Sequence, residues 1–81
     1  MSMENLELYK QAFIETFTLR EDEIGENTTM DNIELWDSVG HINLVVSIEM
    51  AFDIEMSLED VSALTSFEGG KEILKKYGID I

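Results

Sequence analysis

The residue with the clearest chemical potential is Ser38, which stands between Asp37 and Val39 at the start of a long apolar run. Either Asp37 or Ser38 can supply the side-chain oxygen that caps the start of a helix. A hydroxyl at this position is also well placed to carry an anionic modification, because the amides at a helix N-terminus favour negative charge. The sequence therefore gives Ser38 two interpretations, a helix cap and an attachment site.

The only histidine, His41, follows Ser38 by three residues, which makes the two neighbours on a helix. A catalytic serine and histidine pair needs a third group that orients the imidazole and an oxyanion-binding motif, and neither is evident. We therefore predict no catalytic residue, and we expect His41 to be partly buried or at the rim of the Ser38 site, touching a phosphate attached there. The carboxylates of Asp31, Glu34 and Asp37 lack the spacing of an EF-hand loop, so no metal site is predicted.

These residues introduce a helix that is predicted over residues 37–53, where no proline interrupts the run. One side of this helix suits a core and comprises His41, Leu44, Val45, Ile48 and Phe52. A second apolar row lies about half a turn away and comprises Val39, Ile42, Val46 and Met50. Because a chain of 81 residues has only one small core to cover, the second row is predicted to be either a docking surface or a lipid-like contact.

The segment that follows Trp36 resembles the attachment motif and second helix of acyl carrier proteins. The resembling stretches are Asp37-Ser38-Val39, Leu44-Val45, Ile48-Glu49 and Phe52-Asp53-Ile54-Glu55-Met56. In that family the serine of an Asp-Ser-Leu motif carries phosphopantetheine, whose terminal thiol holds an acyl group as a thioester. The resemblance implies that Ser38 carries phosphopantetheine, with Asp37, Val39 and His41 beside it. It extends, more weakly, over nearly the whole chain.

The resemblance also implies that partner enzymes dock beside Ser38. The second apolar row would supply the contact area, and the acids that would steer basic partners are Glu34, Asp37, Glu49 and Asp53. The expected partners are a phosphopantetheinyl transferase, a ligase or acyltransferase that loads the arm, and a ketosynthase or other enzyme that uses the acyl group.

The chain departs from the best-known fatty-acid carriers along this helix. Where those carriers commonly have acids, the chain has Gly40, Asn43, Met50 and Ala51. Trp36 also stands where the family often has a small residue; we expect it to form a partly buried lid, with contact to the arm or a partner as the alternative. We therefore expect a specialised lipid, polyketide or polysaccharide-modification pathway rather than primary fatty-acid synthesis.

The composition is that of one small acidic domain spanning residues 1–81. Eighteen acidic residues against 5 basic ones give a formal charge of -13, which opposes binding to nucleic acids and anionic membranes. The chain has no cysteine, so any thiol chemistry has to be imported. No signal peptide and no long apolar run are evident, so we expect a monomeric cytoplasmic protein without stable membrane insertion.

The predicted fold is all-α, a four-helix bundle of the acyl-carrier type with three longer helices, a short third helix and a long first loop. The first helix is predicted over residues 3–17 with Ser2 as its cap. The residues expected to pin the first loop to the core are Leu19, Ile24, Met30, Ile33 and Leu35.

Capping patterns mark the last two helices. The third helix is predicted after a cap at Ser57, with Leu58, Val61 and Leu64 on its apolar side. The fourth is predicted to open at the capping box Thr65-Ser66-Phe67-Glu68 and to end at Gly78.

Other functions remain open for this sequence. An aminoacyl or peptidyl carrier would use Ser38 in the same way. A non-modified acidic interaction module would instead use the second apolar row as a permanent dimer interface. A nucleic-acid mimic would block a basic site by its charge alone.

Overall fold

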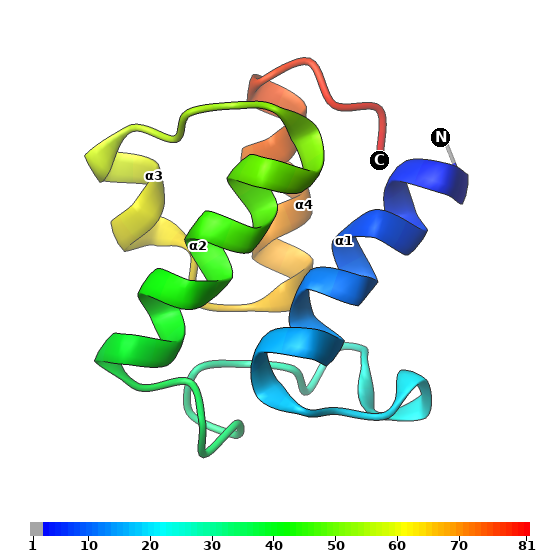
Figure 1. Ribbon diagram of the computed structural model, residues 1–81, viewed down its shortest axis with the longest axis vertical. Helices are drawn as coiled ribbons and strands as arrows, with labels where there is room; N and C mark the ends of the chain where they lie inside the picture. Colours follow the sequence, from blue (N-terminus) through cyan, green and yellow to red (C-terminus); the bar gives the residue numbers. More distant parts are fainter. Residues whose placement is uncertain (1–2) are drawn as a thin grey trace.

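The structure, a computed structural model that describes residues 3–81, consists of helices joined by loops (Figure 1). Its helices are α1 (Met3–Phe17), α2 (Ser38–Phe52), α3 (Leu58–Ala63) and α4 (Phe67–Lys76), and the first loop holds a 3-10 turn, η1 (Glu21–Glu23). No strand occurs among the described residues. The predicted all-α fold, with three longer helices, a short third helix and a long first loop, is confirmed. The expected cap at Ser2 lies outside the described residues.

An aromatic cluster fills the centre of the molecule, because α1 directs an aromatic ring inward every four residues. These rings belong to Tyr9, Phe13 and Phe17, and all three are buried. The ring of Phe13 lies 5.2 Å from that of Phe67 in α4 and 5.5 Å from that of Trp36 in the first loop. Both contacts are edge to face, an arrangement that stabilises beyond the area buried. The cluster thus joins the first helix, the first loop and the last helix.

The hydroxyl of Tyr9 explains the glycine at position 70. It donates a hydrogen bond of 2.7 Å to the carbonyl oxygen of Phe67, in the first turn of α4. A Cβ atom at Gly70 would overlap this hydroxyl, so only glycine allows α1 to approach so closely. Burial, with a smaller effect of Glu68, raises the pKa of Tyr9 far above its usual range. The phenol therefore stays neutral and keeps its proton for this bond.

The first loop is attached to the turn before α4 by backbone hydrogen bonds. The amide of Met30 donates to the carbonyl of Thr65 at 2.9 Å, and the amide of Phe67 donates to the carbonyl of Thr28 at 2.8 Å. Four of the five predicted pins pack against the core: Leu19, Ile24, Met30 and Ile33. The prediction for Leu35 is wrong, because its side chain is exposed and its carbonyl oxygen lies against the start of α2 instead.

Serine side chains cap both of the last two helices. The hydroxyl of Ser57 accepts a hydrogen bond of 3.2 Å from the amide of Asp60, as the sequence predicts. The hydroxyl of Ser66 accepts one of 2.9 Å from the amide of Gly69. In the predicted capping box the cap is therefore Ser66, and not Thr65, whose carbonyl instead accepts from the first loop.

Leu58 differs from its prediction as a core residue of α3. Its side chain is 86% exposed. It is the first residue of a six-residue helix at the edge of the molecule (Figure 1). Within α3 the core contact is Val61, and the fully buried Leu64 follows directly after the helix. Six residues make fewer than two helical turns, and Leu58 at the start of the first turn lies outside the core.

A polar cluster centred on Asp60 joins α3 to the end of α4. The ammonium of Lys76 lies 2.5 Å from one carboxylate oxygen of Asp60, and the hydroxyl of Tyr77 donates to the other at 2.6 Å. The oxygen of that hydroxyl in turn accepts a bond of 2.9 Å from the amide of Ser57. The hydrogen bond from Lys76 is the main cause that lowers the pKa of Asp60, and the same pair raises the pKa of Lys76.

Replacing Asp60 with asparagine is expected to lower the free energy of unfolding at neutral pH and to remove part of its pH dependence. A carboxylate with a lowered pKa stabilises the fold above its unfolded-state pKa of about 3.9 and loses this effect as the pH falls further. Because the pKa of Lys76 is raised, the pair also stabilises the fold below the unfolded-state pKa of lysine, and this stabilisation is lost as the pH rises above about 10. Denaturant midpoints measured across pH should show wild type and variant converging at both extremes. Glu55→Gln, at an exposed neighbour, is the control, and a constant difference at every pH would contradict the expectation.

Candidate functional site

Ser38 is the first residue of α2, and its side chain is exposed. The cap of the helix is Asp37, whose carboxylate accepts a hydrogen bond of 2.8 Å from the amide of Gly40. Among the described residues, the hydroxyl of Ser38 has no hydrogen-bond partner. Of the two interpretations open for Ser38, the structure removes the helix cap.

The surroundings of Ser38 suit an anionic group. The first amides of a helix lack partners within the helix, and together they give its N-terminus a partial positive charge. In α2 the carboxylate of Asp37 uses the amide of Gly40, and the amide of His41 donates to the backbone carbonyl of Asp37 at 2.8 Å. The amides of Ser38 and Val39 precede these and belong to the same exposed turn. A phosphate ester on the Ser38 hydroxyl would lie at this end of the helix.

Gly40 fixes how the first loop enters α2. This residue is buried, and a Cβ atom there would overlap the carbonyl oxygen of Leu35 and crowd the ring of Phe17. Sequence reasoning treated Gly40 only as a position without the acid common in fatty-acid carriers. The structure shows instead that the loop backbone passes too close to the helix for any side chain.

Trp36 and His41 form a hydrogen-bonded chain that crosses from the loop to α3. The indole N–H of Trp36 donates to His41 Nδ1 at 3.0 Å, and His41 Nε2 lies 2.7 Å from the carbonyl oxygen of Val61. Because an indole nitrogen can only donate, Nδ1 accepts, so Nε2 carries the proton and donates to Val61. Trp36 stacks on Phe17 at the entry to the helix and is buried, more completely than the partly buried lid that the sequence predicts.

This chain changes the interpretation of His41. Both of its ring nitrogens are engaged, so a contact with a phosphate on Ser38 would require one of the two hydrogen bonds to break. The same engagement leaves no ring nitrogen to take a proton from Ser38. In this arrangement His41 connects α2 to α3.

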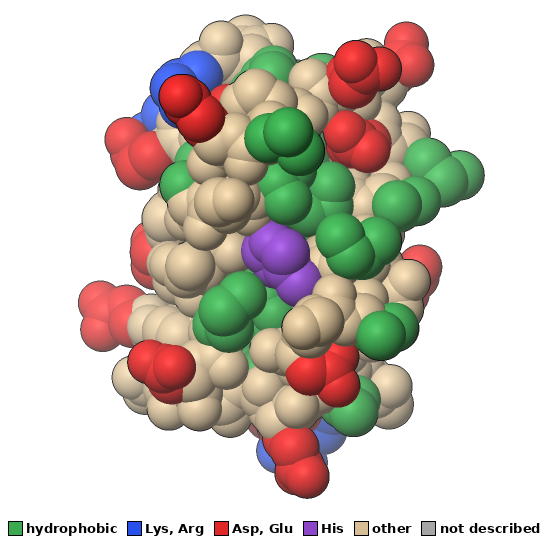
Figure 2. All heavy atoms as spheres, turned by 90° about the vertical axis from the view of Figure 1, so that its left-hand side faces the viewer, with side chains coloured by type: hydrophobic (Ala, Val, Ile, Leu, Met, Phe, Trp, Pro, Cys, Tyr) green, Lys and Arg blue, Asp and Glu red, His purple; other side chains and the backbone are tan. Residues whose placement is uncertain are grey.

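The two apolar faces predicted for α2 are both present. Leu44, Val45 and Ile48 are buried, while His41 and Phe52 are half-buried. The second row is exposed: Val39 by 70%, Ile42 by 55%, Val46 by 46% and Met50 by 79%. Figure 2 shows hydrophobic side chains gathered around the single histidine on one face, with acidic side chains mostly toward its edges. We call these four exposed residues the apolar strip.

The apolar strip does not belong to a membrane span, since no described helix is long and apolar enough to cross a membrane. Nor do the nearby carboxylates gather into a metal site. Among residues 3–81, no three histidine or carboxylate side chains converge in a way that could hold an ion.

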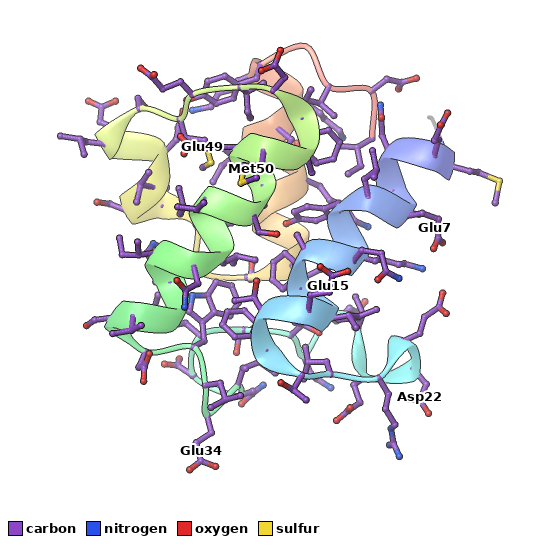
Figure 3. All side chains as sticks on the ribbon, viewed as in Figure 1. Glu7, Glu15, Asp22, Glu34, Glu49 and Met50 are labelled. Atoms are coloured by element: carbon purple, nitrogen blue, oxygen red, sulfur yellow. The ribbon has the colours of Figure 1, made fainter. Side chains whose placement is uncertain are left out.

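The four acids predicted to steer partners do not form one group. Glu34 lies in the loop before α2 and points away from the helices, whereas Glu49 lies near the far end of α2 (Figure 3). Asp37 caps the helix start, and Asp53 follows its last residue. The carboxylate of Glu49 is half-buried and accepts a hydrogen bond of 2.8 Å from the amide of Met56, which closes the loop after α2. Sequence reasoning missed this internal use of Glu49.

No protein-family model, curated protein or solved structure matches this chain. The geometry of Ser38 and of α2 is therefore what bears on the function of the protein.

Proposed function

We propose that this protein is a carrier, folded as a helical bundle of the acyl-carrier type, in which Ser38 holds a phosphopantetheine arm. The observation that supports this most is the exposed Ser38 hydroxyl at the start of α2, which the helix does not use because Asp37 supplies the cap. The helix end favours the phosphate, and the apolar strip begins at the next residue, Val39. The arm, when present, supplies the thiol that a chain without cysteine lacks, so that acyl groups can be carried as thioesters.

Attachment of the arm is a group transfer that a separate transferase would carry out with coenzyme A. The Ser38 oxygen would form a bond to the phosphorus that bears the pantetheine. The phosphoanhydride bond of coenzyme A would break, adenosine 3′,5′-bisphosphate would leave, and the serine proton would pass to a base of the transferase. No oxidant or reductant is needed. In this step Ser38 is an acceptor, and we infer no catalytic activity for the chain itself.

The proposed partners follow from this role. They are the phosphopantetheinyl transferase, a ligase or acyltransferase that loads the arm, and a ketosynthase or another enzyme that uses the acyl group. Because α2 carries one carboxylate along its length, a specialised lipid, polyketide or polysaccharide-modification pathway fits better than primary fatty-acid synthesis. An aminoacyl or peptidyl cargo is the variant of this proposal.

A second candidate is a non-modified interaction module. It is favoured by the exposure of the apolar strip, which such a module would cover with a permanent partner or a second copy. This candidate does not need a hydroxyl at position 38.

Intact mass distinguishes the two candidates. The protein would be incubated with coenzyme A, magnesium and a broad-specificity phosphopantetheinyl transferase and then weighed. A carrier gains the mass of one arm per chain. An unchanged mass, with the fold intact by circular dichroism, would reject the carrier proposal.

A further inference from the structure

The exposed side of α2 carries no ionised group, although the whole chain has a formal charge of -13. In the 15 residues of α2 the only carboxylate is Glu49, and there is no lysine or arginine. Glu49 is half-buried and holds the amide of Met56. The exposed residues of α2 are Ser38, Val39, Ile42, Asn43, Val46, Met50 and Ala51.

Binding to an uncharged apolar surface is driven by burial of its area and not by charge. Burying it gains the hydrophobic free energy of its area, and no carboxylate has to lose its water. A surface held by ion pairs behaves differently, because exposed pairs weaken as salt screens them. The side chains of the apolar strip thus fit a partner whose contacting groove is itself apolar and uncharged.

The charge of the chain also decides what kind of partner covers the strip. Two copies meeting face to face would bring together two charges of -13, which opposes self-association. An anionic lipid surface is repelled in the same way. Acids flank α2 along the chain, with Glu34 in the loop before it and Asp53 directly after its last residue, and positive groups around a partner's groove would meet them. The occupant that suits both features is another protein with an apolar groove and a basic rim.

We propose that the enzymes that act at Ser38, beginning with the transferase that installs the arm, dock on the apolar strip through an uncharged groove and are held by apolar burial rather than by ion pairs. This inference rests on the proposed carrier function. According to this inference, the acids that flank α2 speed the first encounter with the enzyme, and the central residues Ile42 and Val46 determine the affinity of the complex.

The test compares two kinds of variant as substrates for a broad-specificity transferase at saturating coenzyme A. Ile42→Ser and Val46→Ser shorten the strip without adding charge. Glu34→Gln and Asp53→Asn remove the charges that flank α2, and asparagine suits the left-handed backbone of Asp53. Leu8→Ser, at an exposed leucine of α1, is the control for loss of a surface apolar group that does not belong to α2. Thermal unfolding confirms that each variant is folded.

Each strip variant is expected to lower kcat/KM by about fivefold to tenfold, as for a residue near the centre of an interface. The ratio of wild type to strip variant should stay constant from about 0.05 to about 0.5 M sodium chloride, while the smaller ratio for the charge variants falls to one. Taking ratios cancels the effect of salt on the transferase itself. Leu8→Ser should match wild type.

Three results would overturn the inference. In the first, the charge variants lose more activity than the strip variants. In the second, the strip variants are unaffected while wild type still gains its arm, which leaves the carrier function standing. In the third, sedimentation shows a dimer, or the protein binds neutral lipid vesicles, and the strip variants abolish that association. A wild type that gains no arm rejects the carrier function, and this inference falls with it.

Discussion

Replacing Ser38 with alanine is expected to abolish the gain of the phosphopantetheine mass completely. Only an oxygen at this position can form the new phosphate ester. The fold should tolerate the change, because the side chain is exposed and Asp37 provides the cap. The free energy of unfolding is therefore expected to change by no more than about 0.5 kcal/mol, as for an ordinary surface substitution. Intact mass and chemical denaturation measure the two effects on the same samples.

Two further variants make this result specific. Ser47→Ala replaces the other serine of α2 and should leave the mass gain in place. Asp37→Ala removes the cap and should lower the free energy of unfolding by about 1 kcal/mol. If instead Ser38→Ala proved as destabilising as Asp37→Ala, the hydroxyl would have a structural role after all. If Ser38→Ala still gained the arm, the attachment site would lie elsewhere.

Replacing Gly40 with alanine is expected to destabilise the protein and to slow arm transfer. Helix propensity alone predicts the opposite, a gain of about 1 kcal/mol, because alanine is the better helix former. The added Cβ, however, would overlap the carbonyl oxygen of Leu35, and a backbone atom cannot rotate away. We expect a net loss of about 2 kcal/mol, the range found when a packed site is overfilled. To relieve the overlap, the loop segment before Ser38 has to move.

Gly25→Ala is the matched control for Gly40→Ala. Gly25 lies in the same loop, and a Cβ atom there would meet nothing within 4 Å. Gly25→Ala should leave the free energy of unfolding unchanged or raise it by up to about 1 kcal/mol, since alanine restricts the unfolded chain. Denaturation followed by the fluorescence of the single tryptophan, Trp36, reports on the affected region. Equal stability of the two variants would show that the loop does not press on the helix start.

The helices were predictable because their signals are local. The periodicity of apolar residues predicted α1 and both faces of α2, and serine caps marked the later helices. The choice between Asp37 and Ser38 as the cap was not predictable, because both side chains are good caps and adjacent in sequence. Only the path of the loop into α2 decides it.

The contacts that shape the site were not predictable, because they join residues that no local pattern relates. Trp36, His41 and Val61 come from the loop, α2 and α3, and their hydrogen bonds depend on how these elements pack. The closeness of Gly40 to the Leu35 carbonyl depends on the same packing. Glu49 looked like a surface acid, because its bond to the Met56 amide spans a loop whose path the sequence does not specify.

Because α3 is short, its order depends on the helices beside it. Isolated helices need about 12–15 residues to persist in water, so six residues are ordered by their neighbours. Those neighbours hold α3 from two sides, through His41 on Val61 and through Lys76 on Asp60. A displacement of α2 therefore acts on α3 directly, through the hydrogen bond between His41 and Val61. The amide protons of α3 should be the first to exchange with solvent when α2 shifts.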